Sequence, residues 1–241
     1  MLVVLGALAY RRAVVSGRGR VWPVRRTLCW VLGWAAVALA VTGPLAVAAH
    51  QSFTAHMGTH LLLGMVAPLL LVLAAPVTVA LRVLPVRAAR RLSAVLRSRP
   101  VAVSTEPVVA LTLNLGGLVL LYLTPVYDLM HQHALLHAAV HLHTLAAGTL
   151  LMVAVLSPDP RPHRRSLRHR TVVLVVALAA HDIVAKHLYA HPPAGVESAE
   201  RGAMLMYYGG DAVDVVALLV LGFRWYRRTR PRPLPVDPAL A

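Results

Sequence analysis

Long apolar stretches alternate with short arginine-rich segments throughout this chain. Seven stretches of predominantly apolar residues predict helices, at residues 2–15, 28–42, 53–81, 101–122, 128–156, 171–190 and 202–223. A helix needs about 20 such residues to span a bilayer, so the first stretch is short and its helix could begin upstream of Met1. We therefore predict an all-α fold: a polytopic membrane bundle of seven transmembrane helices in one domain, residues 1–230, followed by a Pro-rich disordered tail, residues 231–241.

The basic residues predict how this bundle is oriented. Residues 11–26, 82–99, 161–170 and 224–232 contain 22 of the 24 Lys and Arg residues. Because Lys and Arg accumulate in short cytoplasmic loops, we expect the N-terminus outside and the C-terminus, with its tail, in the cytoplasm. This topology accounts for the net charge of +15 without nucleic acid as a partner.

Composition excludes a soluble fold and one kind of metal site. With 58% hydrophobic and 14% charged residues, the chain has too much apolar surface for a soluble domain of 241 residues. Its single cysteine, Cys29, rules out a disulfide within the chain and a metal site built from several thiolates.

The histidines gather on one side of the predicted membrane. Eleven of the 13 lie at or near the outer ends of predicted helices, and only His163 and His169 lie in a basic loop. Imidazoles in apolar helices are costly to leave unpaired, and imidazole is the commonest ligand of transition metals in proteins. The pattern therefore predicts a metal site toward the outer side.

Two four-residue repeats supply the candidate ligands. His56 and His60 share one face of a helix, and the second repeat lies on another helix, where His131 and His143 fall on other faces. At ~1.5 Å per residue, both repeats reach ~10–15 Å below the outer surface. We predict the metal ligands His56, Met57, His60, His133, His137 and His141, with His60, His137 and His141 as the core of the site.

Other residues at a similar depth extend this site. His181, Asp211 and Asp214 are expected either to orient a ligating histidine or to form a proton path, and both alternatives stay open. Met204 is a further candidate ligand, because thioether and imidazole together suit Cu(I). Packing is the competing interpretation, since an isolated histidine in a membrane helix is often only hydrogen-bonded and an isolated methionine usually belongs to the core.

The segment HMGTHLLLGMVAPLLLVLAAPVTVALRVLP, residues 56–85, resembles the signature segment of the CtaG-type cytochrome c oxidase assembly proteins. The resemblance continues through RVWPVRR at 20–26, YLTPVYDLMHQHALLHAAVHLH at 122–143, SPDP at 157–160 and GAMLMYYGGD at 202–211. It implies a seven-helix protein of the bacterial plasma membrane that is not an enzyme, associates with copper as Cu(I) and helps to mature the copper sites of the oxidase. The implied partners are oxidase subunits, a periplasmic copper chaperone and the lipid bilayer.

The residues that match the motifs of this family are the six candidate ligands, the 202–211 segment, and Pro68, Pro76, Asp159 and Pro160. The chain departs from these relatives before its last helix. It has Ser198, Ala199 and Glu200 where relatives often carry an Asp-Gln pair, and Tyr207 where they carry a Trp. An acidic ligand in that loop is therefore not expected.

Three alternative functions would use the same residues. A copper transporter would carry the ion across the membrane, but no ladder of His and Met continues into the cytoplasmic half. A diiron or dicopper oxygenase would use the His-x3-His spacings, yet enzymes with similar spacing keep them on the cytoplasmic side within HxxHH clusters. Haem held between facing histidines, such as His60 and His137, is the third alternative, and absorbance of the purified protein would identify it.

Overall fold

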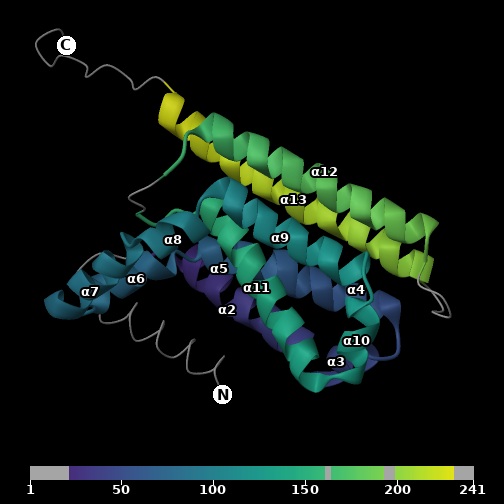
Figure 1. Ribbon diagram of the computed structural model, residues 1–241. Helices are drawn as coiled ribbons and strands as arrows, with labels where there is room; N and C mark the ends of the chain where they lie inside the picture. The colour runs from purple at the N-terminus through teal and green to yellow at the C-terminus, as the bar shows by residue number, and fades with distance from the viewer. Residues whose placement is uncertain (1–21, 161–163, 193–198, 231–241) are drawn as a thin grey trace, which may run out of the picture.

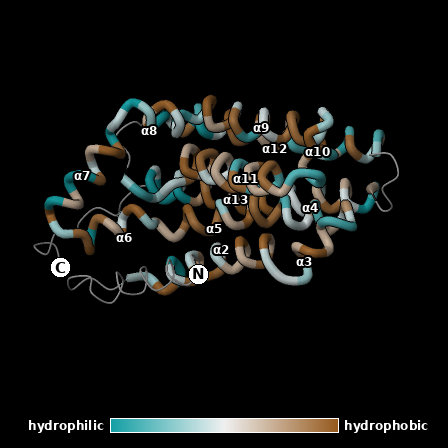
Figure 2. Tube along the Cα trace, turned by 60° about the horizontal axis from the view of Figure 1, so that its bottom comes forward, coloured by the Kyte–Doolittle hydropathy of each residue, from teal (hydrophilic) through white to brown (hydrophobic). Residues whose placement is uncertain are grey.

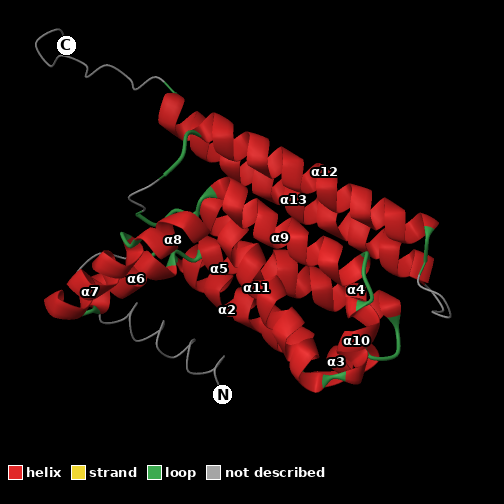
Figure 3. Cartoon of the chain, viewed as in Figure 1, coloured by secondary structure: helices red, strands yellow, loops and turns green. Residues whose placement is uncertain are grey.

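The computed structural model describes residues 22–160, 164–192 and 199–230, and within these ranges the ordered elements are helices without strands (Figure 3). In chain order they are α2 (Val24–Val41), α3 (Gly43–Ala48), α4 (Phe53–Leu61), the π-helical turn η1 (Leu62–Val66), α5 (Ala67–Leu73), α6 (Pro76–Val83), α7 (Val86–Leu96), α8 (Arg99–Ser104), α9 (Pro107–Tyr122), α10 (Val126–Gln132), α11 (Ala134–Leu156), α12 (Leu167–Ala190) and α13 (Ala199–Thr229). The prediction of an all-α fold is confirmed.

Five helices among the described residues are long and apolar enough to cross a membrane: Val24–Val41, Phe53–Leu73, Ala134–Leu156, Leu167–Ala190 and Ala199–Thr229. The pair α9 and α10 would be a sixth span, although it is bent by 75°. The predicted first helix, residues 2–15, and the predicted tail, residues 231–241, lie outside the described residues. The chain is therefore a multi-pass membrane protein with five or six candidate spans in its described part.

The two ends of the bundle differ in chemistry. Helices α6, α7 and α8 and the end of α13 lie at one end, whereas α3, α10 and the start of α4 lie at the other (Figure 1). Hydrophobic residues fill the middle, where α5, α9, α11, α12 and α13 enclose the largest apolar core (Figure 2). The arginines of α6–α8 and of the α13 end define the basic end, and the histidines of α4, α10 and the start of α11 define the histidine end.

The predicted third span, residues 53–81, ends earlier than expected. Ala75 adopts a left-handed conformation with φ of 56°, and Pro76 then starts the separate helix α6. The Asp159 carboxylate accepts hydrogen bonds from the N–H groups of Val77 at 3.3 Å and Thr78 at 2.8 Å, and from the Thr78 hydroxyl at 2.5 Å. Asp159 therefore anchors the start of α6, which gives the SPDP motif a structural role.

The predicted fifth span, residues 128–156, is also interrupted. His133 has an extended backbone, with φ of −130° and ψ of 107°, and separates α10 from α11. The break turns α10 away from the axis of α11, so residues before and after His133 do not share one helical periodicity. His133 itself caps α11, and its carbonyl accepts a hydrogen bond from the His137 N–H at 3.0 Å. The ladder of His133, His137 and His141 therefore begins at the break, and its role as a ligand set stays a prediction.

A π-helical turn lies between α4 and α5, close to Pro68. Pro68 has no N–H to donate to the carbonyl of Gly64, four residues earlier, and a π turn is a known way to accommodate such a loss. Gly148 of α11 packs against that carbonyl, since a Cβ on Gly148 would clash with the Gly64 oxygen and lie 3.1 Å from Pro68 Cγ. This close contact brings α11 against η1, next to the histidines.

Candidate functional site

The start of α4 determines where its two histidines lie. The Ser52 hydroxyl caps the helix by accepting a hydrogen bond from the Ala55 N–H at 3.4 Å, and His56 and His60 follow one turn apart. His56 is only 3% exposed, and its Nε2 lies 3.2 Å from the hydroxyl of Tyr122 at the end of α9. Its buried Nδ1 has no hydrogen-bond partner. The Tyr122 hydroxyl therefore contacts Nε2 of this ring, and Nδ1 is available to a ligand.

Rings from five parts of the chain (the turn before α4, then α4, α9, α10 and α11) meet at the histidine end and form one group. We call this group the ring cluster: His50, His56, His131, His137, His141, Tyr122 and Tyr127. Ring centroids are 4.2 Å apart for His137 and His141 and 4.8 Å apart for His50 and His137. His131 lies 6.2 Å from His50, 6.4 Å from His137 and 6.0 Å from His56. Each histidine in the cluster thus has another imidazole as a direct neighbour.

The helix breaks explain two members of the cluster that the sequence analysis did not include. His131 was expected to point elsewhere because residues 128–156 were treated as one helix, but the break at His133 turns α10 so that His131 faces His56 and His137. His50 lies in the turn between α3 and α4, where no helical spacing could relate it to α11. In the sequence, only its position just before α4 indicated that His50 could lie near the site.

The spacing of these rings suits a shared metal ion. Imidazole nitrogen binds a transition metal at about 2.0–2.1 Å, so two rings on one ion have centroids about 5–6 Å apart. The rings of His50, His131 and His137 form a triangle with sides of 4.8, 6.2 and 6.4 Å. Among the described residues, however, no three His, Cys, Asp or Glu side chains already stand in position to hold a metal ion. Binding would require the exposed rings of His50 and His131 to rotate.

A groove gives the ring cluster access to its surroundings. It has a volume of about 440 Å³, lies between α2, α3 and α11, and has His50, His137 and His141 in its wall. His50 and His131 are exposed, whereas His56 is buried behind them. The cluster therefore runs from the surface of the protein into its interior.

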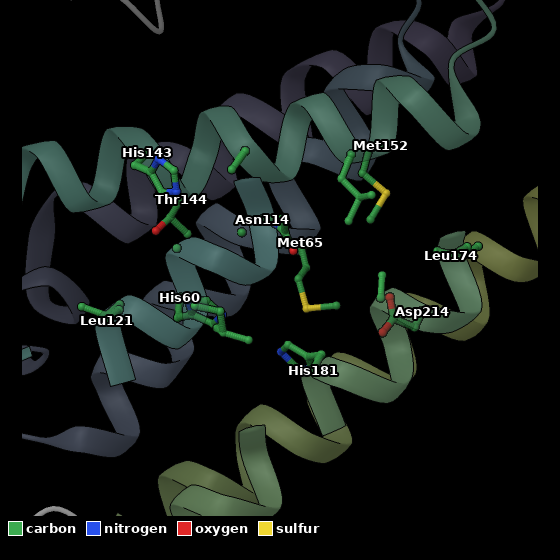
Figure 4. A pocket seen from close by; sticks show the side chains of 16 residues that line it. His60, Met65, Asn114, Leu121, His143, Thr144, Met152, Leu174, His181 and Asp214 are labelled. Atoms are coloured by element: carbon green, nitrogen blue, oxygen red, sulfur yellow. The ribbon is translucent and has the colours of Figure 1, made fainter. Parts of the chain in front are cut away.

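A separate, smaller cavity lies deeper in the bundle, and we call it the inner cavity. It has a volume of about 40 Å³, and His60, Met65, His181 and Asp214 line it (Figure 4). The rings of His60 and His181 have centroids 6.2 Å apart and planes within 9° of parallel. His60 lines this cavity, whereas His137 and His141 line the groove, and the core site expected of the three stays a prediction.

Three carboxylates lie near this cavity on α12 and α13. Asp182 on α12 and Asp211 on α13 lie close to each other. Asp214 is buried and faces the inner cavity, with His181 across from it (Figure 4). His181 and Asp214 thus share one cavity, and the roles expected of His181, Asp211 and Asp214 stay predictions.

Three predicted ligands lie outside both groups. His133 is exposed at the start of α11, and Met204 on α13 is 45% exposed. Met57 is fully buried in an apolar cluster with Phe53 and Met206. The surroundings of Met57 match the packing interpretation, whereas the ligand roles of His133 and Met204 stay predictions.

Comparison with known proteins places this architecture in a family. The cytochrome c oxidase caa3 assembly factors (Caa3_CtaG) match residues 4–228 of the chain. Uncharacterized proteins of Mycobacterium bovis and Mycobacterium tuberculosis are each 35% identical over 178 residues, which cover 70% of this chain and 27% of theirs. An uncharacterized protein of Mycobacterium leprae is 32% identical over 187 residues, which cover 74% of this chain and 27% of its own.

The chain thus spans about a quarter of the length of the curated relatives it matches. No solved structure matches the chain.

Proposed function

The chain belongs to the family of cytochrome c oxidase caa3 assembly factors, and we propose that it assists assembly by binding copper at the ring cluster and passing it to an oxidase subunit. Family membership supports the role in oxidase assembly. The copper step is supported by one observation above all, the gathering of five imidazoles at the end of the bundle opposite the arginines.

The orientation follows from the same asymmetry. Lys and Arg near membrane-spanning helices favour the cytoplasmic side, so the basic end would face the cytoplasm and the ring cluster the outside. Copper would then arrive from a carrier outside the bacterial plasma membrane, such as a periplasmic copper chaperone. His50 and His131 are exposed at that end and would receive the ion first.

The chemistry of the cluster fits copper better than an anion or an organic substrate. Neutral imidazole is a good ligand for copper, and Cu(I) tolerates the low coordination numbers that two or three rings can supply. The buried, unpartnered Nδ1 of His56 is a donor position behind the exposed rings.

Transfer would proceed by ligand exchange. Donor atoms of the accepting subunit would replace the imidazoles of this chain one at a time, so that the ion is never released to solvent. No covalent bond of a substrate is broken in this exchange, and the protein would therefore act as a carrier and not as an enzyme.

Copper binding by the purified protein tests the first step. The protein is loaded anaerobically with Cu(I) in detergent, desalted and analysed for copper per chain. The double variant His50→Ala/His137→Ala should lose about one ion per chain, because it removes two neighbouring rings of the cluster. The control His169→Ala, at the basic end, should keep the full amount, since His169 contacts Glu106 at 3.4 Å and no ring of the cluster. Undiminished copper in the double variant would refute the proposed site.

Oxidase assembly in cells tests the second step. Cells that lack this protein should contain oxidase with less copper and an altered absorption spectrum, and added copper should restore both. The wild-type protein and the His169→Ala variant should complement the defect, whereas the His50→Ala/His137→Ala variant should not. Fully metallated oxidase in the deletion strain would exclude a role in delivery.

A further inference from the structure

We propose that the inner cavity is a second copper site, formed by His60, Met65 and His181, with Asp214 facing the same space. This inference rests on the proposed copper function of the chain and extends it, because it places a second ion below the ring cluster. Two imidazoles and one thioether are a ligand set that selects Cu(I) over harder cations.

The π-helical turn is what brings two of the ligands together. In an α-helix, residues four apart share a face, so Gly64 would lie below His60. A π turn hydrogen-bonds between residues five apart, and this widening lets Met65 share the wall of the cavity with His60. Gly64 stays beside the ring, since a Cβ there would lie 3.6 Å from His60 Cε1. π turns occur frequently at functional sites of helices. The irregularity near Pro68 therefore has a chemical consequence, which is a thioether next to an imidazole.

His181 is the strongest sign that the cavity holds a ligand. The residue is 8% exposed, and neither of its ring nitrogens has a hydrogen-bond partner. Leaving a buried polar group unsatisfied costs free energy of folding, and a metal ion bound to one nitrogen would remove part of that cost. Gly210 on α13 makes room for the ring, since a Cβ there would lie 2.5 Å from His181 Cε1 and 2.9 Å from Nδ1.

The geometry and size of the cavity indicate a single ion. Two imidazoles that bind one ion from opposite sides at about 2.0 Å have ring centroids about 6 Å apart, and the rings of His60 and His181 are 6.2 Å apart and almost parallel. In Figure 4 the Met65 sulphur, the His181 ring and the Asp214 carboxylate point into the same space. A volume of about 40 Å³ holds an ion or one or two waters, but it is far too small for a haem macrocycle.

Asp214 would balance the charge of this ion. The carboxylate is 4% exposed and lies on the far side of the cavity from His60 (Figure 4). A monovalent cation in an apolar bundle is costly without a compensating negative charge. An ionised Asp214 opposite Cu(I) makes the site neutral overall.

Tyr122 links the two sites. Its ring lies 6.1 Å from that of His56 in the ring cluster and 5.7 Å from that of His60 in the inner cavity. His56 and His60 are one turn apart on α4, so an ion could move from one to the other by exchange of a single imidazole. The inner cavity would therefore store an ion that the ring cluster has collected.

X-ray absorption of the Cu(I)-loaded protein tests this site, because sulphur and nitrogen ligands scatter differently. The wild type should bind two ions and show a copper–sulphur distance of about 2.3 Å, similar to other metal–sulphur bonds. Met65→Leu, which conserves volume, should lose this sulphur signal. The matched control Met206→Leu, a fully buried methionine in an apolar cluster, should retain it.

Two further measurements separate this inference from the proposed function. His181→Gln should lower the copper content from two ions to one, and the remaining ion should have only nitrogen ligands. The His50→Ala/His137→Ala variant should retain one ion, with its sulphur signal. Copper with nitrogen ligands alone in the wild type, or a sulphur signal that survives Met65→Leu, would overturn the inner site and leave the ring cluster intact. A wild-type protein that binds no copper would overturn both.

Discussion

Replacing Gly148 by alanine adds one methyl group at the point where α11 crosses the π-helical turn. The new Cβ would overlap the carbonyl oxygen of Gly64 and lie 3.1 Å from Pro68 Cγ. A backbone carbonyl cannot rotate away as a flexible side chain can. The two helices must therefore separate, and the contacts beside Gly148 must loosen.

The size of the effect follows from two opposing contributions. Overpacking of a tight core contact costs about 1–3 kcal/mol, whereas alanine in place of glycine within a helix stabilises by up to about 1 kcal/mol. Gly116 on α9 isolates the second contribution, because a Cβ there would have nothing within 4 Å. The alanine gain is common to both variants, so we expect Gly116→Ala to be neutral or stabilising, and Gly148→Ala to be less stable than Gly116→Ala by the overpacking cost of about 1–3 kcal/mol.

Thermal unfolding of both variants in the same detergent, followed by circular dichroism at 222 nm, measures this difference. For a chain of this size it corresponds to a gap in Tm of about 2–12 °C. The inner cavity adjoins η1, so Gly148→Ala should also weaken Cu(I) binding there, while Gly116→Ala should not. A Gly148→Ala variant as stable as Gly116→Ala would show that the close approach of α11 to η1 is wrong.

Three further predictions concern the ends of the bundle. Asp159→Ala should lower stability by about 2 kcal/mol, because the start of α6 loses three hydrogen bonds, and proteolysis between α5 and α6 should accelerate. Glu106, just before α9, has a lowered pKa: partial burial raises it, but the amide N–H groups of Val109 and Val108 and the Arg165 guanidinium outweigh this. Its ionised form therefore stabilises the fold above about pH 4.3, so Glu106→Gln should be about 0.5–1 kcal/mol less stable at pH 7 and equal to the wild type once the pH falls below the folded pKa. Tyr122→Phe removes the hydroxyl that contacts His56 Nε2, and a change in the affinity of the ring cluster for Cu(I), with unchanged Tm, is the expected result of a titration.

The class of the protein and the location of its chemistry could be predicted from the sequence. Apolar stretches and arginine-rich loops identify membrane helices because a bilayer imposes both length and charge distribution. The accumulation of histidines at one end follows from the same reasoning, and the structure has the histidine end opposite the basic end (Figure 1). The membrane helices and the two chemically different ends are predicted from averages over many residues. A break in a single helix does not change these averages.

The composition of each site could not be predicted, since it depends on breaks in helical geometry. The segment His131–Gln132–His133 contains no Gly or Pro, so nothing in it indicates that α10 ends there. Regular periodicity therefore placed His131 away from the ladder, whereas its ring lies 6.4 Å from that of His137 in the structure. Pro68 did indicate a disturbance of its helix, but a kink and a π turn are alternative responses to a missing N–H, and the sequence alone does not show that Met65 shares the cavity wall with His60.

Both irregularities occur where the ligands are, and this has a physical reason. A regular helix presents residues at fixed spacing, so two parallel helices offer imidazoles in rows that meet at few points. The break at His133 lets His131 reach His56 across the bundle, and the π turn adds a thioether beside an imidazole. Such departures are destabilising in themselves, and they persist only where surrounding contacts hold them, as Gly148 does against the Gly64 carbonyl. The two candidate copper sites therefore depend on the packing of α11 against η1. A substitution that straightens either helix should move the candidate ligands apart before it unfolds the bundle.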